Sequence, residues 1–115
     1  MIAQLGPIRS QLGLGYNPGM LFEEFRSSLD SDHPPKDAAP LLTALWWDEK
    51  GDWEKAHEIA QVIESADAAW VHAYLHRKEG DEGNAGYWYR RAGRPHSRLP
   101  LATEWEEIVR EFLGK

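Results

Sequence analysis

Two histidines and a glutamate have types and spacings that could bind a metal ion. His72 and His76 lie four residues apart, and Glu79 follows three residues after the second histidine. On a helix these spacings place the three side chains on one face. Two imidazoles and a carboxylate on one face are possible ligands for Zn²⁺. The zincin motif, however, needs glutamate directly after the first histidine, and Ala73 stands there.

A further histidine could extend this face into an aromatic groove. His57 follows Trp53 by one helical turn and could meet the other histidines across two helical hairpins. Such a groove binds peptides or small ligands through ring contacts and a few hydrogen bonds. The alternative is that the rings are core and the histidines donate to neighbouring carboxylates. The candidate binding residues are Trp47, Trp53, His57, His72 and His76.

Basic side chains concentrate late in the chain. Residues 77–98 carry six basic and three acidic side chains, whereas the whole chain has a formal net charge of −6. Arginines near a helix end complement its dipole, and acidic residues of the last helix could pair with them. Because arginine forks also suit anions, Arg90, Arg91 and Arg94 are candidates for an anion site.

Composition excludes several classes of protein. A chain of 115 residues with 42% hydrophobic side chains is one domain with a modest core. The absence of cysteine excludes disulfides, iron–sulfur clusters and thiol chemistry. The acidic net charge argues against nucleic acid or an anionic membrane as partner. No apolar run of 18 residues, secretory signal, Walker loop or Gly-x-Ser-x-Gly motif is present, so we expect a cytoplasmic protein.

The elements that must position these residues are all helical. Glycines and a proline predict an irregular arm over 1–16, and Asn17-Pro18 predicts the start of a first helix over 18–30. A linker over 31–37 follows. Residues 38–93 show no strand-like alternation, and they predict helices throughout.

An internal repeat divides residues 38–93 into two hairpins. An offset of 29 residues aligns 44–63 with 73–92, and each copy has an alanine, a Gly-Asp pair and a second alanine. Glycine ends one helix and aspartate caps the next, while the alanines let the paired helices approach closely. We therefore expect antiparallel pairs of 38–50 with 52–64 and of 67–79 with 82–93.

These residues resemble known helical repeats. Ala73, Gly80-Asp81, Ala85, Tyr89 and Ala92 match the small and aromatic positions of a tetratricopeptide repeat, and 87–93 resembles the second helix of a Sel1-type repeat. The motifs within 45–57, 69–81 and 84–93 are similar to those of a set of small uncharacterised, mainly bacterial proteins. The resemblance covers about half of the chain and implies a fold of tetratricopeptide-like hairpins, with no activity attached.

The C-terminal segment predicts an amphipathic helix over 101–113. Pro100 stands near its start, and Thr103 and Glu106 have the spacing of a capping box. An apolar stripe predicts that this helix docks over the open end of the second hairpin. The predicted fold class is all-α, with two tetratricopeptide-like antiparallel helical hairpins and flanking N-terminal and C-terminal helices.

The sequence favours a non-catalytic interaction module over an enzyme. We expect its Trp/His-lined face to bind a protein segment or a second copy of the chain, with large rings as anchors. Apolar Leu21, Phe22 and Phe25 on the first helix are consistent with a homodimer. The first alternative is a small-molecule-binding domain that uses the same groove. The second alternative is a metal protein or enzyme centred on His57, His72, His76 and Glu79. Apart from that alternative, we expect no cofactor.

Overall fold

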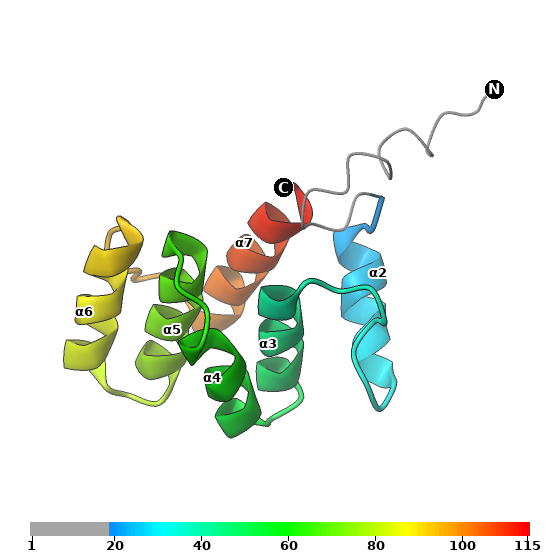
Figure 1. Cartoon of the computed structure of the whole chain (residues 1–115), viewed down its shortest axis with the longest axis horizontal. Coiled ribbons are helices and arrows are strands. Elements are labelled where there is room, and N and C mark those ends of the chain that lie inside the picture. Colours follow the sequence, from blue (N-terminus) through cyan, green and yellow to red (C-terminus); the bar gives the residue numbers. More distant parts are fainter. Residues whose placement is uncertain (1–18) are drawn as a thin grey trace.

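The structure is a computed structural model that describes residues 19–115. This part of the chain contains seven helical segments joined by turns and loops (Figure 1). None of the described residues forms a strand, so the predicted all-α fold class is confirmed. No helix of this part has both the length and the apolar character needed to cross a membrane. The segments are α2 (Phe22–Ser27), the 3₁₀ helix η1 (Ser28–Asp30), α3 (Pro40–Glu49), α4 (Trp53–Gln61), α5 (Ala66–Lys78), α6 (Glu82–Ala92) and α7 (Leu101–Leu113).

Two Gly-Asp turns connect α3 with α4 and α5 with α6. Gly51 and Gly80 have φ angles of +96° and +92°, in the left-handed region that glycine adopts without steric cost. Asp52 and Asp81 each accept a hydrogen bond from the backbone N–H three residues further on, at 3.0 and 3.1 Å. Each turn therefore ends one helix and caps the next, as the repeat predicts.

Buried alanines let the helices of each hairpin approach closely. All four alanines of the repeat are fully buried, and α4 also packs against α5, so that the two hairpins lie side by side. Figure 1 shows α3, α4, α5 and α6 in sequence across the molecule. The alanines are Ala44, Ala56, Ala73 and Ala85.

The C-terminal helix makes wider contacts than the sequence predicted. α7 packs against α3 and α5 and contacts α2. Its Trp105 contacts the rings of Phe22 and Phe25, with centroids 6.1 and 6.0 Å apart, and donates from Nε1 to the carbonyl of Leu45 at 3.0 Å. The helix therefore contacts α2 and both hairpins, and not the second hairpin alone, as the sequence predicted.

Packing of α7 on the first helix buries most of the apolar surface of that helix. Phe22 and Phe25 are buried within the chain, and only Leu21 of the three apolar residues is strongly exposed, at 65%. The apolar surface that favoured self-association through this helix is thus mostly internal, and a homodimer stays a prediction.

Several predicted helix ends need correction. The arm over 1–16 and the start at Asn17-Pro18 lie outside the described residues. α2 and η1 together cover 22–30, and α3 begins at Pro40 instead of 38 because proline suits the first helical position. The capping box at Thr103 is wrong, since α7 begins at Leu101 and the carbonyl of Pro100 accepts the first helical hydrogen bonds.

A fully buried carboxylate, that of Glu104 on α7, ties this helix to α5 and α6. One of its oxygens accepts from the Arg77 guanidinium at 2.8 Å. The other accepts from the Trp70 indole at 3.2 Å and from the Tyr89 hydroxyl at 2.6 Å. Burial and the bond to Glu104 raise the pKa of Tyr89 above its usual value. The predicted pairing of the last helix with arginines is confirmed at this contact.

Candidate functional site

Three histidines converge between α4 and α5. His57 Nε2 lies 2.9 Å from His72 Nε2, and the rings of His72 and His76 stack with centroids 4.9 Å apart. One nitrogen from each of the three rings lies within 4.8 Å of the other two. The one-turn spacing of His72 and His76 on α5, together with the packing of α4 on α5, produces this arrangement. We call these residues, His57, His72 and His76, the histidine cluster.

Two tryptophan rings flank the histidine cluster. Trp53 stacks on His57 with centroids 4.9 Å apart, and Trp88 from α6 stacks on His72 at 3.9 Å, both at interplanar angles of 10°. The Trp53 indole donates to the carbonyl of Leu75 at 2.8 Å, which holds its ring in place. Trp88 was not among the predicted site residues. Its position one helical turn after the repeat alanine at 85 offered no signal beyond core packing.

The carboxylate of Glu79 bonds to one histidine of the cluster. Its Oε2 lies 2.7 Å from His76 Nδ1, which leaves Nε2 of the same ring as the other possible ligand atom. Of the predicted ligand set of His72, His76 and Glu79, the two histidines lie beside His57, whereas Glu79 bonds to His76 and groups with it and Asp81. The ligand set itself stays a prediction.

Burial keeps two of the histidines neutral. It lowers the pKa of His72 to about 4, with smaller contributions from the charges of His57 and His76. Burial and the charge of His76 lower the pKa of His57 from its usual value as well. At pH 7 these two imidazoles thus retain a free lone pair, the form that ligates a metal.

Four of the five residues of the predicted aromatic groove come together in the structure. His72 and His76 are each 7% exposed, while His57 and Trp53 are half-buried at the surface of the cluster. Trp47 packs elsewhere, edge-on to Trp46 at 5.0 Å. The Lys55 ammonium lies 3.9 Å from the centre of the Trp47 ring. Trp47 is therefore separate from the four residues that the structure brings together.

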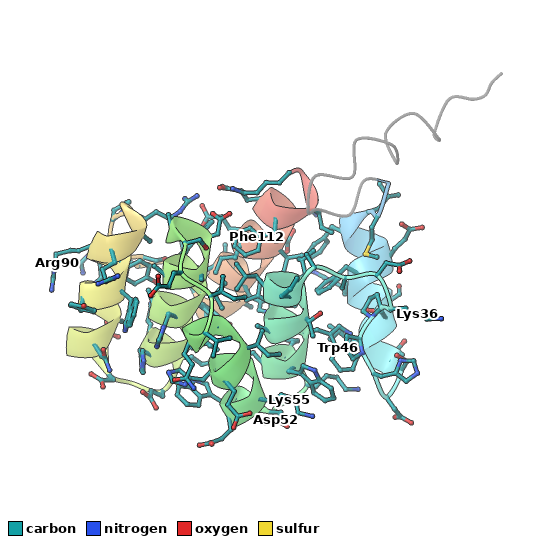
Figure 2. The ribbon with its side chains drawn as sticks, in the orientation of Figure 1. Lys36, Trp46, Asp52, Lys55, Arg90 and Phe112 are labelled. Carbon is teal, nitrogen blue, oxygen red and sulfur yellow. The ribbon has the colours of Figure 1, made fainter. Side chains whose placement is uncertain are left out.

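The three candidate anion-binding arginines diverge. Arg94 pairs with Glu111 at 2.5 Å and covers the Trp70 ring at 3.4 Å. Arg91 lies over the Trp88 ring at 5.3 Å. Figure 2 shows Arg90 pointing away from the outer side of α6. The structure thus forms no shared site from these three residues.

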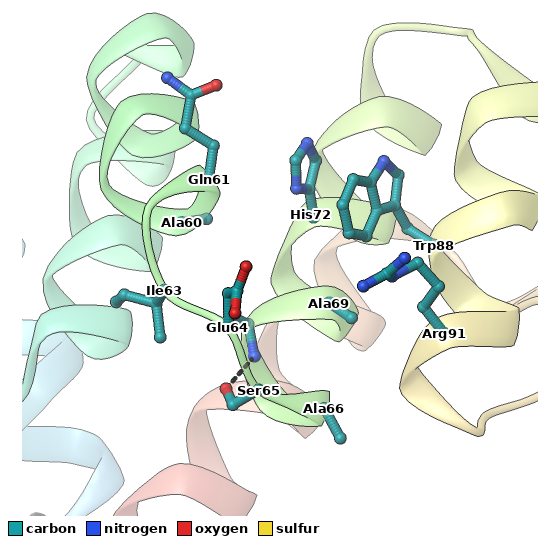
Figure 3. Close-up of a pocket in the computed structure, with 11 residues that line it drawn as sticks. Ala60, Gln61, Ile63, Glu64, Ser65, Ala66, Ala69, His72, Trp88 and Arg91 are labelled. Atoms are coloured by element: carbon teal, nitrogen blue, oxygen red, sulfur yellow. Dashed lines mark hydrogen bonds between the residues drawn. The ribbon is translucent and has the colours of Figure 1, made fainter.

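A cavity of about 410 Å³ adjoins the histidine cluster. It lies between the end of α4, the loop before α5, the first turns of α5, and α6 (Figure 3). His72 and Trp88 line it on one side and Ala60 on the other, with Arg91 and Glu64 also at its wall. Its size falls within the range of small-molecule sites. His72 therefore belongs both to the histidine cluster and to a cavity.

Comparisons with protein-family models, with curated proteins and with solved structures found no match to this chain.

Proposed function

We propose that the protein binds one divalent transition-metal ion, with Zn²⁺ as the first candidate, through His57, His72 and His76. The observation that carries the proposal is the convergence of three ring nitrogens within 4.8 Å of one another. Zinc binds imidazole nitrogens at about 2.0–2.1 Å, which places tetrahedral ligand atoms about 3.3 Å apart. The observed separations, 2.9 Å between His57 Nε2 and His72 Nε2 and no more than 4.8 Å within the set, bracket that spacing.

The hydrogen bond to Glu79 supports a ligand role for His76. A metal-bound histidine commonly donates its other N–H to a carboxylate, which fixes the tautomer and makes the ring a better ligand. The 2.7 Å contact between His76 Nδ1 and Glu79 Oε2 has this form. Three histidines also leave a fourth coordination position open, as catalytic zinc sites do and closed structural sites do not.

The stacking of the rings favours a metal over a docked peptide. One face of His57 is covered by Trp53 and one face of His72 by Trp88, so these faces contact other rings of the chain. The Nε2 atoms of His57 and His72 face each other instead, and the His57 ring meets those of His72 and His76 edge to face. An interaction module with a Trp/His-lined face remains an untested prediction.

Cobalt titration of the chelator-treated full chain tests the metal site, because Co²⁺ in a site of imidazole nitrogens absorbs visible light and Zn²⁺ displaces it. The expected result is one Co²⁺ per chain. Loss of an outer-shell partner typically weakens metal binding about 10–100-fold. Loss of a ligand should weaken Co²⁺ binding by more than this in each of three variants, His57→Ala, His76→Ala and His72→Phe. His72→Phe keeps a flat ring against Trp88, so that loss of a ligand is separated from loss of packing.

The chain supplies matched controls for this experiment. His33 is exposed in the loop before α3, and His96 pairs with Glu82 at 2.7 Å, so neither belongs to the histidine cluster. His33→Ala and His96→Ala should bind Co²⁺ as the wild type does. Absence of binding to the wild type, or binding of equal strength to folded His57→Ala, would overturn the proposal. Circular dichroism of each variant establishes that it is folded.

A further inference from the structure

The cavity beside the histidine cluster has opposite charges on facing walls. Arg91 extends its guanidinium into the cavity from α6, and Glu64 extends its carboxylate into it from the loop before α5 (Figure 3). Within residues 19–115 Glu64 forms no ion pair and no side-chain hydrogen bond. Among the same described residues, the Arg91 guanidinium donates a hydrogen bond only to the uncharged hydroxyl of Tyr87, at 3.1 Å. Both charges are thus available to a ligand.

The rest of the cavity wall is small or aromatic. Ala60 on α4 and Ala66 and Ala69 on α5 leave room that larger side chains would fill. The Trp88 ring, which stacks on His72 and has the Arg91 guanidinium over it, adds a large apolar group to the wall. A ligand of this cavity therefore has a positive end, a negative end and a modest apolar body.

We propose that this cavity binds a small zwitterion of the amino-acid or dipeptide class. The ligand carboxylate pairs with Arg91, its ammonium group pairs with Glu64, and its apolar side chain lies against Trp88. Guanidinium forks match carboxylates in a two-point contact, and charged hydrogen bonds of this kind are the strong ones. A volume of about 410 Å³ accommodates a ligand of this size.

His72 connects this ligand to the proposed metal site. It lines the cavity, and its Nε2 faces His57 within the histidine cluster. A ligand in the cavity therefore contacts His72, one of the three residues proposed to hold the ion, so we expect binding at one site to affect the other. This expectation rests on the proposed function, whereas the charge pairing with Arg91 and Glu64 does not.

Calorimetric titration with alanyl-leucine tests the charge pairing. The probe is compared with N-acetyl-alanyl-leucine, which lacks the ammonium group, and with alanyl-leucine amide, which lacks the carboxylate. We expect either blocked form to bind at least about tenfold more weakly, because each loses a charged hydrogen bond. Arg91→Ala should weaken binding of alanyl-leucine and abolish discrimination against the amide. Glu64→Gln should do the same for the acetylated form.

Neighbouring residues of the same charge provide controls. Arg90→Ala removes the adjacent guanidinium, which points outward from α6 (Figure 2) and does not line the cavity, and Glu58→Gln changes an exposed carboxylate on α4. Both variants should bind the dipeptide as the wild type does. All four substitutions are at exposed positions, so we expect the variants to remain folded.

The outcomes separate the two proposals. Titration of alanyl-leucine into the Co²⁺-loaded protein should change the visible absorption of Co²⁺. Normal Co²⁺ binding without any binding of alanyl-leucine overturns the zwitterion site alone. Dipeptide binding with no Co²⁺ binding overturns the metal site alone. Equal binding of the free and blocked dipeptides shows that the end charges are not recognised, and it also overturns the zwitterion site.

Discussion

Replacement of Glu104 by glutamine should strongly destabilise the protein while preserving the size of the side chain. All three partners of this carboxylate are donors: the Arg77 guanidinium, the Trp70 indole and the Tyr89 hydroxyl. A glutamine amide has one acceptor oxygen and one NH₂ donor. Whichever way it is turned, the NH₂ group faces a donor, and at least one buried donor loses its partner.

The magnitude follows from burial. Glu104 is fully buried and the Arg77 side chain is 13% exposed, so water cannot easily replace the lost contact. Breaking a buried ion pair by changing one partner costs about 3–5 kcal/mol. Arg77 also donates to the carbonyl of Leu99, which satisfies part of its hydrogen-bonding capacity. We therefore expect the lower end, about 3 kcal/mol, or roughly 12 °C in melting temperature for a domain of about 100 residues.

Urea unfolding followed by tryptophan fluorescence measures this change, since the rings of Trp70 and Trp105 lie in the core. Glu107→Gln, at an exposed position of the same helix, should change the free energy of unfolding by less than about 0.5 kcal/mol. A Glu104→Gln variant within about 1 kcal/mol of the wild type would refute the argument that this carboxylate is an essential acceptor for three buried donors.

Three further predictions concern the outer part of the site, a turn and a buried charge. Glu79→Gln should weaken Co²⁺ binding about 10–100-fold, because it removes the charge behind His76, and an unchanged dissociation constant would contradict an outer-shell role. Gly80→Ala should lower the free energy of unfolding by about 1–2 kcal/mol, because alanine is strained at a φ of +92°. Gly83→Ala within α6 should raise the free energy of unfolding by about 0.5–1 kcal/mol. Urea unfolding curves in which Gly80→Ala is at least as stable as Gly83→Ala would contradict this prediction. Burial raises the pKa of Asp48 in the folded state, so its contribution to stability is present below its ordinary pKa and lost as the pH rises through the raised value. The melting temperature of Asp48→Asn relative to the wild type should thus increase between pH 4 and pH 7, and a constant difference would show that the pKa is not raised.

The hairpins could be predicted because their signals are local. A glycine with a positive φ and an aspartate that caps the next helix both act within one turn of the chain. The turns predicted at Gly51-Asp52 and Gly80-Asp81 are therefore the turns that the structure has. Local signals can also compete. Thr103 has the spacing of a helix cap, yet α7 begins two residues earlier, at Leu101, and Pro100 is its N-cap residue.

The candidate site could be predicted in part. The one-turn spacing placed His72 and His76 on one face of a helix, and the same argument added Glu79 to it. It could not establish that Glu79 bonds to His76 Nδ1, or that His57 approaches the two helical histidines from α4. A spacing on one helix determines which side chains are neighbours, but ring orientation depends on contacts with the neighbouring helix.

The amino-acid sequence by itself determined the helices, their two Gly-Asp turns and the pairing of helices within each hairpin, because these depend on backbone conformation and hydrogen bonds over a few residues. Only the tertiary structure decided that α7 packs against α3 and α5 and that Glu104 meets Arg77. It also decided that His57 approaches His72 to 2.9 Å. Contacts between residues far apart in the chain depend on the distance and angle between packed helices, which the volumes of all the buried side chains set together.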